Sequence, residues 1–85
     1  MNVRLTEKAR RQLERLDEAA VSGICGYLLE IEDLEDPRFR GTELPGKIWG
    51  IWRYRVADHR ILCKLLDDVL LVLSIEQGAG GGIGR

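Results

Sequence analysis

The chain is poor in the features that mark several protein classes. No apolar stretch approaches the ~20 residues that a transmembrane helix needs, and the N-terminus lacks the basic-then-apolar order of a signal peptide. Cys25 and Cys63, the only cysteines, fall far apart at apolar positions, so buried free thiols are expected rather than a disulfide. His59, the single histidine, leaves too few ligands for a structural zinc site. These absences predict a cytoplasmic protein with no membrane segment and no metal.

What the chain does contain is the composition of one small globular domain. Of its 85 residues, 45% are hydrophobic and 32% are charged, which is typical of a folded protein rather than a disordered one. A domain of this size buries only about 60–65% of the surface of its unfolded chain, so there is room for one core. We expect a single domain over residues 1–78, followed by a glycine-rich, disordered tail over residues 79–85.

The net charge of −1 conceals an uneven distribution of charge along the chain. Residues 1–37 carry five basic and nine acidic side chains, and residues 65–85 carry one basic and three acidic ones. Residues 38–64 carry seven basic side chains against two acidic ones, which gives this segment a charge of +5. A basic middle third favours a polyanionic or acidic partner that binds locally rather than over the whole surface.

The first third of the chain has the periodicity of two helices. Apolar residues recur at helical spacing after Thr6 and again after Asp17, and both of these residues are suited to cap a helix. Because almost nothing separates the two patterns, we expect an antiparallel helical hairpin. Residues 1–5 have the character of a short strand. The apolar positions of the two helices are Leu5, Ala9, Leu13 and Leu16, then Val21, Ile24, Leu28, Ile31 and Leu34.

A loop and three strands are expected in the remainder. Proline and glycine punctuate residues 35–46, as is typical of a loop. The expected fold class is α+β, with a short N-terminal strand, a two-helix antiparallel hairpin and a three-stranded antiparallel meander. The strands of the meander are predicted from alternating apolar residues, with two-residue turns between them, at 48–56, 59–66 and 69–75.

Two-residue turns would sort the side chains of the meander onto two faces, because successive side chains of a strand point in opposite directions. One face would pack against the helices and carry Trp52, Tyr54, Ile61, Cys63, Leu65, Leu70 and Val72. The second face would carry the basic residues Arg53, Arg55, Arg60 and Lys64 among the apolar residues Leu62, Leu71, Leu73 and Ile75.

This second face combines two features that are unfavourable in a free protein. Arg55 would lie directly opposite Arg60, and like charges in that position destabilise a sheet by up to about 1 kcal/mol. The four apolar residues would form an exposed patch that monomers rarely keep without a use. A bound polyanion would relieve the first feature, and a docked peptide or helix would cover the second. The alternative is that the register slips, or that carboxylates elsewhere pair with the arginines.

Three stretches within residues 5–78 carry a resemblance to a known family: "LTEKARRQLERLD", "YLLEIEDLEDPRFRGTELPGKIWGIWRYRVADHRILCKL" and "DDVLLVLSIEQG". The most specific part is "LPGKIWGIWRYRVADHRILC", a leucine-proline-glycine loop followed by an arginine-rich hairpin. In these stretches and in the order of its elements, the chain resembles the RelE branch of the RelE/ParE superfamily of toxin–antitoxin toxins. The resemblance implies that the basic sheet face holds RNA.

The resemblance also implies an activity, namely cleavage of messenger RNA in the ribosomal A site without metal or another cofactor. The 2′-hydroxyl of the RNA would attack the adjacent phosphorus and leave a 2′,3′-cyclic phosphate and a 5′-hydroxyl end. By position in the family pattern, Arg60 and Arg53 would be catalytic. The implied partners are a cognate antitoxin in a hetero-oligomer, the messenger and the 70S ribosome. RNA would be bound by Arg55, Lys47, Lys64 and Arg40, and the antitoxin by Leu62, Leu71, Leu73 and Ile75.

The sequence departs from the family pattern after Gly78. There the family continues with a basic stretch that ends in glutamate-valine-tyrosine and supplies an arginine and a tyrosine to the site, whereas this chain continues "AGGGIGR". A second hypothesis is therefore a catalytically impaired relative that still binds its antitoxin. A third is a ParE-like inhibitor of DNA gyrase on the same scaffold.

Three aromatic side chains near the arginines invite a functional interpretation as well. Imidazole is a common general acid or base, but the expected register points His59 toward the helices, so a packed structural histidine is favoured. Trp52 lies in the core phase of its strand and is expected to be structural. For Trp49 two roles stay open: stacking on an RNA base and packing within the protein.

Overall fold

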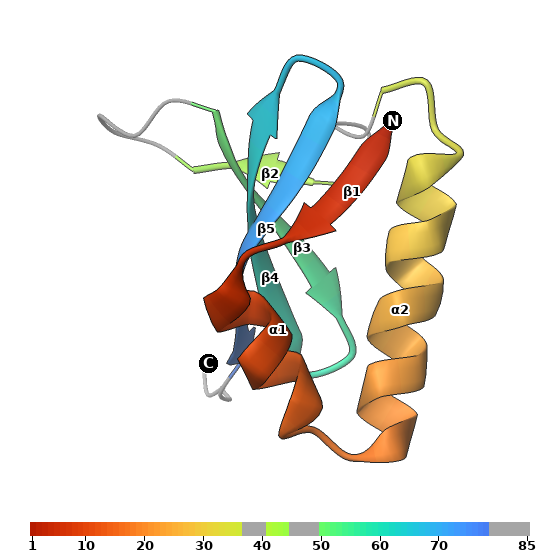
Figure 1. The fold of residues 1–85 in the computed structure, drawn as a ribbon, viewed down its shortest axis with the longest axis vertical. Coiled ribbons are helices and arrows are strands. Elements are labelled where there is room, and N and C mark those ends of the chain that lie inside the picture. Colours follow the sequence, from red (N-terminus) through yellow and green to blue (C-terminus); the bar gives the residue numbers. More distant parts are fainter. Residues whose placement is uncertain (37–40, 45–49, 79–85) are drawn as a thin grey trace.

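A five-stranded sheet with two helices packed against it forms the fold (Figure 1). The computed structural model describes residues 1–36, 41–44 and 50–78. Neither helix in these segments is long and apolar enough to cross a bilayer. In chain order the elements are β1 (Asn2–Leu5), α1 (Glu7–Glu14), α2 (Glu18–Glu32), β2 (Thr42–Glu43), β3 (Ile51–Val56), β4 (His59–Leu66) and β5 (Val69–Gln77).

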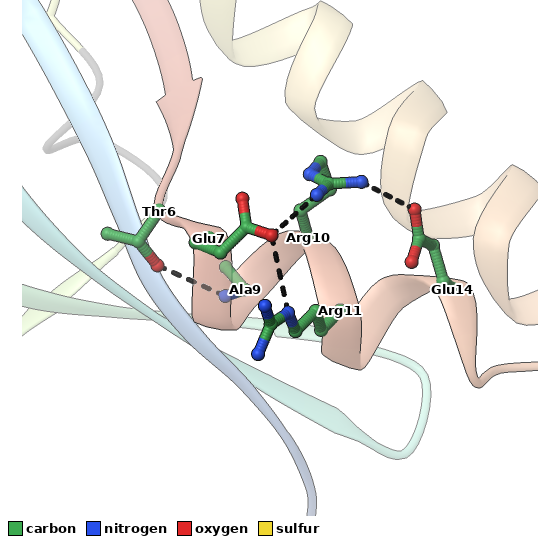
Figure 2. Close-up of polar contacts among 6 residues, drawn as sticks. All are labelled: Thr6, Glu7, Ala9, Arg10, Arg11 and Glu14. Atoms are coloured by element: carbon green, nitrogen blue, oxygen red, sulfur yellow. Dashed lines mark hydrogen bonds and ion pairs between the residues drawn. The ribbon is translucent and has the colours of Figure 1, made fainter.

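Each helix begins at the capping residue that the sequence predicts. Oγ1 of Thr6 accepts a hydrogen bond from the Ala9 N–H at 3.1 Å, as Figure 2 shows. Oδ1 of Asp17 likewise accepts from the Ala20 N–H at 2.8 Å. Both caps satisfy N–H groups that the helix itself leaves unpaired. Because α1 has only eight residues, it would be marginal in isolation and depends on its packing against the sheet.

The sheet is larger than the three-stranded meander that the sequence predicts. The strand order is β1-β5-β4-β3-β2, in which β3, β4 and β5 form the predicted antiparallel meander. β1 adds to it as a parallel partner of β5, with Asn2 opposite Val69. β2 places Thr42 opposite Arg53, inside the segment 35–46 that is predicted as a loop. β1 confirms the predicted N-terminal strand, but its pairing with β5 and the strand β2 are additions that correct the prediction. Strands this short leave no periodicity that reveals a distant partner.

A β-bulge in the last hairpin changes the face that Ile75 occupies. The β4–β5 register shifts between Leu62 and Cys63, so that Leu73 is an extra residue on β5. Ile75 therefore lies opposite Ile61 on the helix-covered face, where only 5% of its surface is exposed. The prediction that Ile75 belongs to the second face is wrong, because the alternation of side chains breaks at the bulge. Its predicted role in antitoxin binding therefore loses the exposed position on which it rests.

One buried cluster joins both helices to the same face of the sheet. The Cys63 thiol is fully buried in it, and this burial raises the pKa of Cys63 to about 12. Cys25 is half buried, and both thiols are free, as predicted. The cluster comprises Ala9, Ile24, Leu28 and Ile31 from the helices and Tyr54, Ile61, Cys63, Leu70, Val72 and Ile75 from the strands.

α1 covers the part of the β5 edge that β1 does not reach. β1 pairs with β5 only as far as Val72. Beyond that point the Thr6 hydroxyl donates to the Leu73 carbonyl at 3.1 Å, and the Ile75 N–H donates to Oε1 of Gln12 at 2.7 Å. These bonds satisfy backbone groups of an otherwise unpaired edge and fix the C-terminal half of β5 against α1.

Candidate functional site

Three arginines of the β3–β4 hairpin line one pocket on the face of the sheet opposite the helices, called the helix-free face below. Arg53 and Arg55 come from β3 and Arg60 from β4, while Thr42 of β2 completes the lining. The pocket has a volume of about 240 Å³. These four residues are called the arginine pocket.

The arginines share this face because the turn between β3 and β4 is two residues long. Ala57 adopts a φ of 52°, the left-handed conformation that two-residue hairpin turns need. The register that results sets Arg55 directly opposite Arg60 and Arg53 opposite Leu62. Both pairs are those that the sequence predicts, although the turn has no glycine. The alternative of a slipped register in this hairpin is thereby excluded.

Within the described residues, no carboxylate forms an ion pair with the guanidinium groups of the arginine pocket. The ion pairs found there lie on α1, where Arg10 contacts Glu7 at 2.6 Å and Glu14 at 2.7 Å, while Arg11 contacts Glu7 at 3.2 Å (Figure 2). The hydrogen bond from Arg10 to Glu7, together with the charge of Glu7, raises the pKa of the Arg10 guanidinium. In the arginine pocket, by contrast, three positive charges repel one another and favour a bound anion.

The degree of burial divides the three arginines. Arg53 and Arg60 are half buried, whereas Arg55 is exposed. Partly desolvated charges interact more strongly than charges in water, and a planar guanidinium group can hold two oxygens of a phosphate at once. Arg53 and Arg60 are therefore placed for the closest contact with a phosphate in the pocket, and Arg55 for contact at its rim.

The other basic residues that the sequence selects are not part of the arginine pocket as described. Lys64 is exposed on the helix-free face, opposite Leu71, and does not line the pocket. Lys47 and Arg40 lie outside the described residues, as does Trp49.

The predicted apolar patch is only partly retained. Leu62 and Leu71 lie on the helix-free face and are half buried. Leu73 is half buried at the bulge, and Ile75 belongs to the core. Leu66, which the sequence interpretation does not select, lies on the same face with 44% of its surface exposed. The role of Leu62, Leu71 and Leu73 in antitoxin binding stays a prediction.

His59 and Trp52 face the helices rather than the arginine pocket. His59 lies opposite Val56 and is 9% exposed, and its Nε2 atom has no hydrogen-bond partner within the described residues. It borders a separate pocket of about 250 Å³ next to the start of α2. Trp52 packs against the core cluster. Both placements agree with the structural roles expected from the strand phase.

Two polar residues of the helix-free face could not be identified from the sequence patterns. Thr42 falls in the predicted loop, and only the pairing of β2 brings it beside Arg53. Glu76 lies one residue beyond the predicted end of the last strand and stands opposite Arg60. Unbroken alternation past Ile75 would have turned Glu76 toward the helices, so the bulge alone brings this carboxylate to the arginines.

The family of the chain is established by a match that covers nearly all of it. A family model described as the ParE toxin of the type II toxin–antitoxin system parDE matches residues 3–80. The chain belongs to this toxin family. Comparison with curated proteins gives no match. The protein is therefore a type II toxin of the RelE/ParE superfamily, as the sequence resemblance predicts.

Solved structures of both branches of the superfamily share the fold of this toxin. The RelBE2 toxin–antitoxin complex from Mycobacterium tuberculosis matches with a TM-score of 0.79 at 22% identity, over 89% of this chain and 95% of that chain. The archaeal RelE–RelB complex from Pyrococcus horikoshii OT3 matches with a TM-score of 0.76 at 19% identity, over 94% and 97%. The chromosomal ParDE system from P. aeruginosa matches with a TM-score of 0.68 at 14% identity, over 91% and 95%. At these identities the likeness shows the fold alone.

Proposed function

We propose that this toxin is a ribosome-dependent endoribonuclease that cuts messenger RNA in the A site of the 70S ribosome, in the cytoplasm. The observation that carries the proposal is the arginine pocket. Three guanidinium groups converge there without a carboxylate partner in the described part of the chain. Such a pocket is suited to an RNA phosphate, because its charges are always present and need no metal.

The proposed reaction assigns separate roles to the arginines. Arg60 and Arg53 contact the phosphoryl oxygens of the scissile group and stabilise the charge that develops on them in the transition state. Arg55, at the exposed rim, contacts a neighbouring phosphate. Lys64, Lys47 and Arg40 contact RNA farther along the backbone, through bonds that weaken as salt is added.

We also assign a cognate antitoxin to the helix-free face. An amphipathic antitoxin segment would cover Leu62 and Leu71 with its apolar side and approach the arginine pocket with acidic side chains. Antitoxins are present in the solved complexes of RelE toxins that share this fold. A bound antitoxin would thereby occupy the surface that RNA needs, which would keep the toxin inactive in a hetero-oligomer.

Cleavage of a defined messenger on purified ribosomes tests the proposal directly. We expect the antitoxin-free toxin to cut in the A-site codon and to leave 2′,3′-cyclic phosphate and 5′-hydroxyl ends. Arg60→Ala should lower the cleavage rate about 100-fold or more, since removal of one charge-stabilising donor has effects of that order. Arg11→Ala is the matched control, because Arg11 lies on α1 in an exposed ion pair and should leave cleavage unchanged.

A messenger that stays intact with the unaltered toxin would contradict the proposal. The missing arginine and tyrosine of the tail would then explain a toxin that folds and binds antitoxin without cutting. In that case, replacing the residues after Gly78 with a basic, tyrosine-ended tail should restore cleavage.

Inhibition of DNA gyrase is a second candidate function, and the match to the ParE toxin family favours it. A supercoiling assay with purified gyrase separates the two candidates. Loss of supercoiling activity on addition of the toxin, with messengers left intact on ribosomes, would support gyrase as the target. Cleaved messengers with unaffected gyrase would support the endoribonuclease.

A further inference from the structure

Glu76 is the carboxylate that the described strands bring to the helix-free face beside the arginine pocket. It lies opposite Arg60, which in turn lies opposite Arg55, so the three side chains form one row across β5, β4 and β3. Neighbouring strands are about 4.8 Å apart, which places Glu76 one strand spacing from Arg60.

The carboxylate of Glu76 is directed back along β5 toward the row that contains Arg53. The Ser74 hydroxyl donates a hydrogen bond to Oε2 of Glu76 at 3.3 Å. Ser74 lies opposite Leu62, and Leu62 lies opposite Arg53. Oε2 is therefore held on β5 next to Ser74, with Arg60 one strand away and Arg53 two strands away on the same face.

The backbone on both sides of Glu76 is fixed, although the side chain is exposed. The Ile75 N–H donates to Oε1 of Gln12 at 2.7 Å, and the Gly78 N–H donates to the carbonyl oxygen of Asp58. These bonds tie the end of β5 to α1 and to the β3–β4 turn. A side chain that takes a proton must be held within hydrogen-bond distance of the group that loses it, and a fixed strand can hold the side chain there.

Other candidate proton acceptors of the described strands point away from the arginine pocket. His59 and Tyr54 are buried on the helix-covered face, and burial raises the pKa of the Tyr54 phenol. Glu43 lies opposite Trp52, which packs against the core.

Attack by a 2′-hydroxyl requires that this group lose its proton. Neither the guanidinium groups nor the ammonium group of Lys64, which shares the helix-free face, has a lone pair to accept it. Among the strand residues that the structure describes, Glu76 is left as the proton acceptor on the face of the arginines.

We propose that Glu76 is the general base of the cleavage, an inference that rests on the proposed endoribonuclease function. A Glu76 oxygen takes the proton of the 2′-hydroxyl as the bond between the 2′-oxygen and phosphorus forms. Arg60 and Arg53 meet the charge on the phosphoryl oxygens. The bond between phosphorus and the 5′-oxygen breaks, the leaving 5′-oxygen takes a proton from water, and Glu76 releases its proton to the solvent, which restores the starting state.

A carboxylate opposite Arg60 can also act as a counterion that competes with phosphate, and the two roles predict opposite effects. Removing a counterion strengthens RNA binding and leaves the rate of the bound complex unchanged or higher. Removing a general base lowers that rate, typically by about 10²–10⁴-fold, without weakening binding. Measuring binding and single-turnover cleavage separately therefore distinguishes them.

The test compares the unaltered toxin with Glu76→Gln, Glu76→Asp and the matched control Glu43→Gln on programmed ribosomes. We expect Glu76→Gln to bind as tightly as the unaltered toxin or more tightly, and to cut about 100-fold more slowly or worse. Glu76→Asp should recover part of the rate, because it keeps a carboxylate on the same strand. Glu43→Gln removes a strand carboxylate from the opposite face and should cut at the unaltered rate.

Three results would overturn the proposal, and they are distinguishable. Equal single-turnover rates for Glu76→Gln and the unaltered toxin would remove Glu76 from the chemistry while leaving the endoribonuclease function in place. Faster cleavage with tighter binding in Glu76→Gln would assign the counterion role instead, again with the function intact. An unaltered toxin that leaves the messenger whole would overturn the general base and the proposed function together.

Discussion

At the scale of single residues, the glycines of this chain differ in what an added side chain would meet. A Cβ at Gly41 would lie 2.8 Å from a ring carbon of Tyr54. Only 1% of the surface of Tyr54 is exposed. A Cβ at Gly26, within α2, would meet no atom within 4 Å of those the structure describes. Gly41 is therefore required by packing, whereas Gly26 only weakens its helix.

The two glycines give a paired prediction on stability. Gly26→Ala should raise the free energy of unfolding by about 0.5–1 kcal/mol, because alanine favours the helix and fills open space. Gly41→Ala should lower it by about 1–3 kcal/mol, because the Tyr54 ring must move within a packed core. Urea denaturation of the two variants beside the unaltered toxin measures both values. A stabilised Gly41→Ala would show that the Tyr54 ring is not held as described.

At the scale of elements, β5 gathers the contacts on which the site depends. It pairs with β1 on one side and with β4 on the other, and α1 takes over where β1 ends. Its bulge turns Ile75 into the core and Glu76 toward Arg60. The position of Glu76 is therefore set by α1 and the bulge together.

The contact between Gln12 and Ile75 can be tested alone. Gln12→Leu removes the acceptor of the Ile75 N–H, and an unpaired backbone donor costs about 1–3 kcal/mol when it is buried. We expect a loss of stability of that order and faster hydrogen exchange at the Ile75 amide, measured by NMR. Gln77→Leu, at an exposed position on the same strand, is the control. Unchanged exchange at Ile75 in Gln12→Leu would contradict the proposed role of α1 at this edge.

At the scale of the whole molecule, the sheet separates stability from recognition. The helices and the buried cluster occupy one face, and the arginine pocket, Leu62 and Leu71 occupy the other. Substitutions on the helix-free face are therefore expected to change binding with little effect on folding. A charged side chain introduced into the core should instead unfold the protein, because a buried charge without a partner is strongly destabilising.

Substitutions of apolar residues by aspartate test this separation. Leu71→Asp should weaken antitoxin binding at least tenfold with a nearly unchanged free energy of unfolding, because it places a charge in the proposed interface. Ile75→Asp should fail to fold, since Ile75 belongs to the core cluster. Leu29→Asp is the surface control, because Leu29 is 63% exposed on α2, away from the helix-free face. Antitoxin affinity is measured by titration calorimetry. An unchanged affinity in Leu71→Asp would rule out the helix-free face around Leu71 as the antitoxin-binding surface.

Features whose partners are neighbours along the chain follow from the local sequence. Thr6 and Asp17 reach backbone N–H groups three residues ahead, so both helix starts could be predicted from the residue types alone. The two-residue turn fixes Arg55 opposite Arg60 through contacts only five residues apart, and the predicted arginine face follows from that register.

Features that join distant segments depend on the folded chain as a whole. The pairing of β1 with β5, the arrival of Thr42 beside Arg53 and the bulge at Leu73 depend on packing across the whole chain. The bond between Gln12 and Ile75 spans 63 positions, and no local periodicity encodes such a contact. Alternation along the strand alone therefore predicts the wrong face for Ile75 and does not indicate Glu76, since one extra residue in a strand reverses the direction of every side chain beyond it.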